Sequence, residues 1–465
     1  MIGGWNIIQN SKIKMNSENS IAKKIITYGI YLLFFVLPFQ TRYFFYSATI
    51  NGEFWEYGSY TLYASELLLF FLAAYSVIYK LVHRDSPREA FPRSLFKKRM
   101  LFYAVALFLL YLIASNIWSV NHTVSFIHTI RFIELIVFVW LLRVNKYTIR
   151  IAALCFVLSM AIHSSFAIVQ FFTQTLPANK WLGVASQNSS VSGVSVVQTF
   201  ARRFLRGYGG MPHPNILGGW LSVTLFIIIA LYHKVKARLR LLLLVAYGVI
   251  FTGLILTVSR SAWLGFASGW ILFLFFLAKT NRFSEWFRGK SDTIALIALT
   301  AAFSIVLGLM LKEPLTERGS MFFVDMRRDA LGYSTLEEKS LNDRKFAIQE
   351  SREIIRKNPI FGTGIGTYTY DRHSASPKFS AIQLQPVHVI FLLILSELGL
   401  IGLILAIMVI FLWFRQLFSD QKIIGIMMGV SLLIVSFFDH YLWTLFSGML
   451  LAGLVIIFSN VLKEA

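Results

Sequence analysis

Three side chains in this sequence, Arg260, Arg344 and His388, have types and positions that suit chemistry on a phosphorylated sugar. A guanidinium group is planar and matches the oxygens of a phosphate. An imidazole titrates near neutral pH and can accept the proton of a sugar hydroxyl. Arg260 lies in a short polar break between two apolar runs, and the other two belong to the end of a long polar segment. We predict that all three meet at one mouth of a membrane protein.

Each of these residues also has an ordinary structural explanation. Arg260 could anchor a helix at the membrane interface, because a charge near the apolar phase must reach water or an anion. Arg344 could be a solvated charge on a helix surface. His388 follows Pro386 at the start of an apolar helix, where its ring could bond to the backbone. The residue types alone leave both interpretations open.

Two further polar groups lie inside apolar runs. Glu397 is a carboxylate that needs a partner if it is buried. Arg131 and Glu134 are three residues apart, so they are neighbours on one helix face and are expected to satisfy each other.

The sequence predicts neither a metal ion nor a cofactor. It contains no D-x-D motif, and no outward segment carries histidines or cysteines at the spacing of metal ligands. The run FGTGIGTY has a glycine spacing like that of nucleotide-binding loops, but a predicted helix precedes it and a polar loop follows. Nucleotide loops need a strand before the glycines and a helix after them, so we interpret this run as a turn.

Composition defines the broad class of the protein. The chain has 465 residues, of which 56% are hydrophobic and 14% charged, whereas soluble proteins average about 25% charged residues. The single cysteine, Cys155, excludes an intrachain disulfide. We therefore predict an all-α fold, a polytopic bundle of about twelve transmembrane helices with a long external loop that contains an amphipathic helix.

The predicted spans are apolar runs with short polar breaks between them. Residues 386–397 either extend the tenth span or form a separate short helix. The twelve runs lie near residues 25–41, 62–82, 100–119, 126–142, 151–172, 214–232, 240–257, 261–278, 292–311, 398–417, 423–438 and 441–460.

The lysines and arginines predict the orientation in the membrane. Every second loop is rich in cations, and such loops face the cytoplasm, which places both termini inside. Most of the net charge of +21 is thus an orientation signal, and we expect membrane lipids rather than nucleic acid as partners. The cation-rich loops lie near residues 12–24, 84–99, 143–150, 234–240, 279–290, 415–422 and 463.

This topology divides the chain into four parts. Residues 1–24 are a cytoplasmic tail, 25–311 hold spans one to nine, 312–387 form the large external loop, and 388–465 hold a re-entry helix and the last three spans. Within the loop we expect a helix that begins at Asn342 or Asp343 and ends before Asn358-Pro359. Other outward segments place Glu53 and Glu56 in the first external segment and Asp439 and His440 in the last external turn.

The motifs of the second half together resemble the O-antigen ligase/polymerase superfamily of bacterial envelope proteins. TVSRSAWLGF is similar to the SR-x-x-W span entry of that family, and DRKFAIQESREIIRKNPIFGTGIGTY to its R…P-x-x-G-x-G segment. HVIFLLILSELGLIGL is similar to its H-N…E-x-G-x-x-G signature, and GMPHPNILGGWL to its upstream P-N motif. The resemblance covers roughly residues 200–455, with the motifs in matching order.

The resemblance implies a metal-independent, inverting glycosyltransferase at the outer face of the cytoplasmic membrane. The donor would be a glycan on undecaprenyl diphosphate, and the acceptor a glycan or lipid A-core. Arg260 and Arg344 would bind the donor diphosphate, and His388 would be the catalytic base. In one departure from the family pattern, Val389 stands where the family usually has Asn. The candidate supporting residues are Arg206, His213, Asn215 and Glu397.

Several alternative functions remain open from the sequence. A polysaccharide polymerase or a protein O-oligosaccharyltransferase would share these motifs. A transporter of lipid-linked glycans would need ionisable groups or broken helices near the middle of the membrane, together with internal repeats. A cell-wall polymerase would rely on an external carboxylate, for which Glu53 and Glu56 are candidates.

Overall fold

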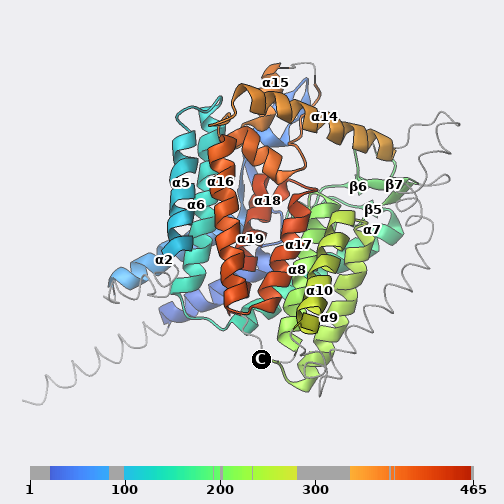
Figure 1. The fold of residues 1–465 in the computed structure, drawn as a ribbon. Helices are drawn as coiled ribbons and strands as arrows, with labels where there is room; N and C mark the ends of the chain where they lie inside the picture. The colour runs from blue at the N-terminus through green and yellow to red at the C-terminus, as the bar shows by residue number, and fades with distance from the viewer. Residues whose placement is uncertain are drawn as a thin grey trace, which may run out of the picture.

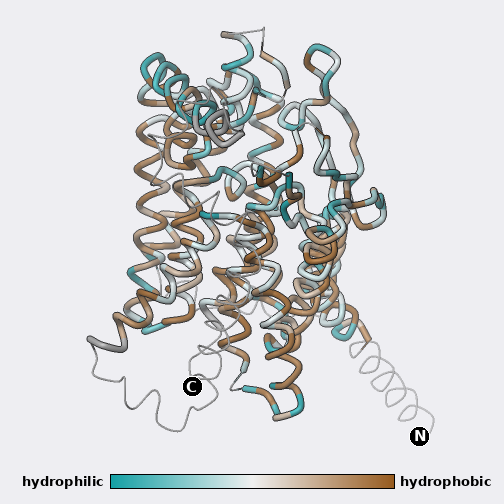
Figure 2. The backbone as a smooth tube through the Cα atoms, turned by 90° about the vertical axis from the view of Figure 1, so that its right-hand side faces the viewer, coloured by the Kyte–Doolittle hydropathy of each residue, from teal (hydrophilic) through white to brown (hydrophobic). Residues whose placement is uncertain are grey.

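The computed structural model describes most of the chain and shows a helical bundle with α14 and α15 across one end (Figure 1). The described residues are 21–82, 99–191, 193–198, 203–232, 234–279, 336–375, 379–381 and 383–461. In Figure 2 the hydrophobic residues dominate the long helices, and hydrophilic residues are concentrated at the end that carries α14 and α15.

The described part of the first half contains five helices and a small hairpin region. Residues 21–36 are helical. The elements that follow are β1 (Arg42–Tyr46), β2 (Thr49–Ile50), β3 (Glu53–Phe54), the 3-10 turn η1 (Glu56–Gly58), β4 (Tyr60–Tyr63), α2 (Ala64–Val82), α5 (Arg99–Ser115), α6 (His122–Val144) and α7 (Ile149–Thr173). The side chain of Asn121 caps α6 by accepting the amide of Val124 at 3.1 Å.

The second half adds the central helices and the external helices. Its elements are β5 (Thr175–Leu176), β6 (Gln187–Asn188), β7 (Val196–Gln198), β8 (Arg203–Leu205), α8 (Pro214–Tyr232), α9 (Ala237–Leu256), α10 (Arg260–Lys279), α14 (Leu336–Lys357), α15 (Tyr368–Ala375), α16 (Ile390–Ser419), α17 (Ile423–Ser436), α18 (Tyr441–Thr444) and α19 (Phe446–Val461).

Helix α8 lies at the centre of the bundle. Almost all of its residues are buried, as expected for a helix that is apolar all round. It contacts α7, α9, α10 and α17. Two adjacent glycines permit close approach, because Gly218 faces Ala262 of α10 and Gly219 faces the hydroxyl of Tyr441. The start of α8 is thereby fixed next to the starts of α10 and α18.

The structure supports a helical membrane protein, whereas the number of twelve spans stays a prediction. Among the described residues, six helices are long and apolar enough to cross a membrane, and four shorter apolar helices accompany them. The span predicted at 292–311 lies outside the described residues. The span predicted at 441–460 is broken at Leu445 into α18 and α19. The all-α prediction also missed small two-stranded sheets, β1–β4, β2–β3, β5–β6 and β7–β8, in the polar segments.

The predicted start of the amphipathic helix in the large loop is wrong. Helix α14 begins by Leu336, so Arg344 is in its ninth position and not in its first turn. The sequence LEEKSL before Asn342 consists mostly of good helix formers. At this position Arg344 lies outside the first turn, so the helix dipole does not disfavour its charge. The predicted end before Asn358-Pro359 is confirmed, because α14 ends at Lys357.

Both alternatives for residues 386–397 proved partly correct, because α16 is continuous but kinked at Gly399. This glycine has φ 63° and ψ −168°, which are not helical angles. A Cβ at this position would lie 2.2 Å from the carbonyl oxygen of Ile360. Only glycine fits this close approach. The kink thus brings the turn after α14 against the middle of α16.

Candidate active site

Arg206 connects the starts of two apolar helices. It follows β8 and is buried. Its Nε donates to the carbonyl oxygen of Thr257 at 2.8 Å, and its Nη2 donates to Oδ1 of Asn215 at 2.7 Å. Thr257 ends α9, and Arg260 begins α10 three residues later. Arg260 therefore lies at the same end of the bundle as Arg206.

The segment GMPHPN supplies two further polar groups at the start of α8. Pro214 is the first residue of the helix, where its missing N–H costs nothing. Nδ1 of His213 accepts the amide of Asn215 at 3.1 Å, and its Nε2 lies 2.7 Å from the hydroxyl of Ser195. The Nδ2 of Asn215 donates to Oδ2 of Asp439 at 2.8 Å. Three of the predicted residues, Arg206, His213 and Asn215, thus belong to one network.

Asp439 and His440 lie between α17 and α18 and are almost completely buried. Oδ1 of Asp439 accepts the amide of His440 at 2.9 Å. The ring of His440 is 5.1 Å from the ring of His388, centroid to centroid. Within the described part of the chain, the buried Nδ1 of His388 has no hydrogen-bond partner. One nitrogen of His388 therefore keeps an unused hydrogen-bonding position.

The histidines around Asp439 are held in the neutral form. Burial, together with the charge of His388, lowers the pKa of His440 to about 3. Burial and the charge of Arg206 lower the pKa of His213 to about 3. Burial and the charge of Arg344 lower the pKa of His388, although Asp439 acts in the opposite direction. A neutral imidazole can accept a proton, so this environment suits a general base.

Asp439 itself stays ionised. Burial acts to raise its pKa, but the neighbouring imidazoles of His440, His388 and His213 and the hydrogen bond from Asn215 lower it below the usual value. A fixed negative charge beside an imidazole stabilises the imidazolium that forms when the base accepts a proton.

Arg344 lies on α14 close enough to His388 to affect its pKa. A salt bridge between Arg372 of α15 and Glu350 of α14 holds this region together. The same guanidinium donates to the carbonyl oxygens of Gln383 and Gln385, at 3.1 and 2.8 Å. These residues lead directly to His388. Arg372 thus connects the helix that carries Arg344 to the segment that carries His388.

Glu397 has the partners that its burial requires. Its Oε2 accepts from the indole Nε1 of Trp443 at 2.8 Å. Its other oxygen accepts from the amide of Tyr368 at 3.4 Å, and the amide of Gly366 also bonds to this carboxylate. Glu397 therefore joins α16, the glycine-rich turn and α18. It supports the site from inside the bundle.

The structure also tests the predictions for the glycine-rich run and for the pair of Arg131 and Glu134. Residues 358–367 form turns without strands, which confirms the interpretation of FGTGIGTY, although the short helix α15 follows instead of a polar loop. The pair of Arg131 and Glu134 is confirmed at 3.2 Å, and Glu66 is a second partner of this arginine. The diphosphate and base roles of Arg260, Arg344 and His388 stay predictions.

Sequence reasoning gave Asp439, His440 and Arg372 no role in the site. The acidic–basic pair in the external turn FFDHY was a usable signal, because an Asp-His pair between two apolar runs needs a reason to be there. No comparable signal marks Arg372 among the many charges of the loop. Its importance depends on Glu350, 22 residues earlier in the chain.

The structure also brings together a group that could hold a metal ion. One ligand atom each from His388, Asp439 and His440 lies within 4.8 Å of the others. The prediction of no metal relied on sequence spacing, which does not reveal ligands that are distant in sequence. Several of these atoms already have protein partners: both oxygens of Asp439 accept hydrogen bonds, and Nδ1 of His440 lies 2.8 Å from the hydroxyl of Thr444.

Apolar helices that bury a polar site at one end of the bundle define a helical membrane protein. Residues 246–407 match the family model described as O-antigen ligase, which supports membership of the O-antigen ligase/polymerase superfamily. The match and the apolar helices support a glycan-transferring membrane protein of the ligase/polymerase type in the bacterial inner membrane. No curated protein matches the chain. The matched range includes Arg260, Arg344 and His388 and ends before Asp439.

Proposed function

We propose that the protein is a metal-independent, inverting glycosyltransferase that moves a glycan from undecaprenyl diphosphate to an acceptor hydroxyl on the outer face of the membrane. One observation carries this proposal. His388, with a lowered pKa and an unpartnered Nδ1 among the described residues, lies beside the ionised Asp439 and within the electrostatic influence of Arg344. This combination supplies a base, a charge that stabilises its protonated form and a cation for a leaving phosphate.

The residues divide the chemical step between them. The acceptor hydroxyl gives its proton to His388, and its oxygen forms a bond to the anomeric carbon of the donor sugar. The bond from that carbon to the phosphate oxygen breaks, and the diphosphate leaves with the electron pair. Arg260 and Arg344 stabilise the charge that develops on the leaving group, an effect typically worth about 10²–10³ in rate per donor.

Arg206 and Asn215 have supporting roles in this proposal. Through Thr257 and Asn215, Arg206 holds the start of α10, where Arg260 lies, in a fixed relation to Asp439. Preorganised groups of this kind need no rearrangement during the reaction. Asp439 orients the histidines His388, His440 and His213, and we call these four residues the base cluster. Val389 caps α16 without a side-chain hydrogen bond. Asn215 and Asp439 thus take the place of an amide directly after His388.

The alternative acceptors remain within the same proposal. Transfer to a second glycan would make the protein a polymerase, transfer to lipid A-core a ligase, and transfer to a protein an O-oligosaccharyltransferase. A mechanism based on an external carboxylate has less support, because Glu56 forms a two-armed ion pair with Arg42. Glu53 is exposed on β3.

Product analysis with purified protein tests the proposal. Wild type and His388→Ala are given an undecaprenyl-diphosphate glycan, several acceptors including the donor glycan itself, and EDTA. We expect transfer by wild type and a loss of about 10²–10⁴ in the variant, the usual contribution of a general base. His122→Ala, which changes an exposed histidine of α6, is the matched control.

Each other result has a defined meaning. Full transfer by His388→Ala would remove this residue as the base. Transfer that disappears only with EDTA would favour a metal ion at His388, Asp439 and His440. Donor binding without transfer to any acceptor would favour a transporter.

A further inference from the structure

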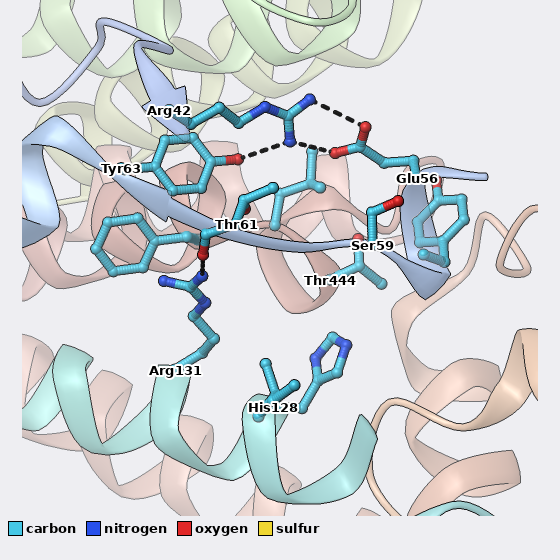
Figure 3. A pocket seen from close by; sticks show the side chains of 12 residues that line it. Arg42, Glu56, Ser59, Thr61, Tyr63, His128, Arg131 and Thr444 are labelled. Atoms are coloured by element: carbon cyan, nitrogen blue, oxygen red, sulfur yellow. Dashed lines mark hydrogen bonds and ion pairs between the residues drawn. The ribbon is translucent and has the colours of Figure 1, made fainter. Parts of the chain in front are cut away.

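A polar pocket forms where the first external segment, α6 and the α18 region meet (Figure 3). The first external segment contributes Arg42, Glu56 and Tyr63 to its wall, α6 contributes His128 and Arg131, and Thr444 of α18 completes it. The cavity volume is about 70 Å³, whereas about 15 Å³ suffices for one water molecule. The pocket can therefore hold a group larger than water.

The guanidinium groups of this pocket are neutralised by carboxylates. Arg42 binds both oxygens of Glu56 and also donates to the hydroxyl of Tyr63 at 3.3 Å. Arg131 forms ion pairs with Glu66 and Glu134 and donates to the carbonyl oxygen of Thr61. Each guanidinium thus already has a carboxylate partner. A pocket whose cations are paired suits an uncharged polar ligand better than a diphosphate.

The pocket also offers an unused hydrogen-bonding atom. Among the described residues, the buried Nδ1 of His128 has no hydrogen-bond partner. A Cβ added at Gly366 would lie 2.2 Å from Cδ2 and 2.8 Å from Nε2 of this ring. The glycine-rich turn therefore covers the Cδ2–Nε2 edge of the His128 ring. The Nδ1 edge lies on the opposite side of the ring. A buried polar atom without a partner in the protein is a natural contact for a ligand.

Aromatic rings and polar groups both line the pocket. Tyr57, Tyr63 and Phe446 provide ring surfaces, and Ser59 and Thr61 provide hydroxyl-bearing side chains. Apolar walls with a few fixed polar groups are typical of small-molecule sites. A sugar ring has apolar C–H faces and a rim of hydroxyl groups, and this wall matches both features.

The pocket and the base cluster share one wall. Nε2 of His440 lies 3.5 Å from the hydroxyl of Tyr57, and its Nδ1 lies 2.8 Å from the hydroxyl of Thr444. Both Tyr57 and Thr444 line the pocket. His440 in turn lies beside His388. A ligand in the pocket is thus separated from the proposed base by the shared wall and by His440.

We propose that this pocket binds the terminal sugar of a neutral acceptor glycan. A substituent of the ring, such as a hydroxymethyl or acetamido group, enters the cavity. The ring lies at the open side and presents one hydroxyl towards His388. This inference rests on the proposed transferase function, and it names the acceptor subsite that the function requires. The ion pair of Arg42 and Glu56 then recognises the acceptor sugar, whereas the catalytic base is His388.

The test compares Glu56→Gln with Glu53→Gln, which removes an exposed carboxylate from the same external segment. Transfer is measured with an undecaprenyl-diphosphate glycan as donor and the repeat-unit oligosaccharide, freed from its carrier by mild acid, as acceptor. We expect Glu56→Gln to raise the acceptor KM about tenfold, the value of one charged hydrogen bond, with a smaller change in the donor KM. Equal acceptor KM values in the two variants, or a dominant change in the donor KM, would overturn the proposal.

A binding measurement keeps the result independent of folding and of the transferase function. His128→Phe fills the pocket without affecting the Arg42–Glu56 pair, and the fluorescent repeat-unit oligosaccharide reports binding directly. Binding to wild type that weakens in both Glu56→Gln and His128→Phe supports the pocket, even if no transfer occurs and the proposed function fails. Absence of binding to wild type, or equal binding to the folded variants, contradicts the pocket.

Discussion

The base cluster and the neighbouring pocket use similar residue types in opposite ways. Around Asp439, one carboxylate is shared by three imidazoles whose pKa values are lowered. Around Arg42, each guanidinium has at least one carboxylate of its own. In the first arrangement the imidazoles are neutral and can accept a proton, whereas in the second each guanidinium is already paired with a carboxylate. This difference fits the proposed division between a region that accepts a proton and a region that only binds.

The largest expected effect on the transfer rate comes from the two arginines proposed to bind the diphosphate, and not from the paired arginines of the pocket. Arg260→Ala and Arg344→Ala should each lower the transfer rate by about 10²–10³, because each removes a cation from the leaving diphosphate. Initial rates at saturating acceptor and a donor-binding assay measure this effect. Arg352→Ala, an exposed position on the helix that carries Arg344, is the control. Full activity in either variant would remove that arginine from the diphosphate site.

A smaller effect is expected from the connection that fixes the base cluster. Arg372→Gln should lower the free energy of unfolding by about 3 kcal/mol, because it leaves Glu350 partly buried without its partner. The segment before His388 also loses two hydrogen bonds. Thermal unfolding in detergent and the transfer rate measure the two consequences. A variant as stable as Arg352→Ala would show that the salt bridge does not fix the segment.

The smallest effect concerns the pH dependence of stability. The pKa values of His213 and His440 are about 3 in the folded protein and ordinarily about 6.5. The unfolded chain therefore takes up protons first as the pH falls, and stability decreases from about pH 6.5 towards pH 3.

Thermal unfolding between pH 7.5 and 5 checks this prediction. Asp439, whose pKa is lowered, loses its contribution only below that window. His213→Gln should show a shallower slope than wild type. Equal pH slopes of stability in wild type and His213→Gln would mean that His213 is not held neutral. The contrast between the neutral histidines of the base cluster and the charged pairs of the pocket would then weaken.

Local patterns in the sequence predicted much of this fold. Apolar runs gave the helices from α2 to α10 within a few residues, and Asn358-Pro359 gave the end of α14. The start of α14 was missed because Asn342-Asp343 is a good cap signal inside a segment that is already helical. The hairpin of β1 and β4 was missed because its aromatic residues resemble an interfacial loop.

The site was predictable only where a motif was local. His388, Arg344, Arg260 and the P-N segment each stand in a recognisable context. Asp439 lies 51 residues after His388, and its hydrogen bond joins it to Asn215, 224 residues earlier. Such pairs follow from how α8, α16 and α17 pack, which no local pattern contains. The pocket beside Arg42 likewise forms from three separate parts of the chain.

The buried carboxylate of Glu397 has a consequence for how this protein can diversify. It joins α16, the glycine-rich turn and Trp443 of α18 from inside the bundle, so this anchor of the elements next to His388 and His440 lies outside the hairpins of residues 42–63. Substitutions at exposed positions of those hairpins, such as Glu53, can accumulate without removing this anchor.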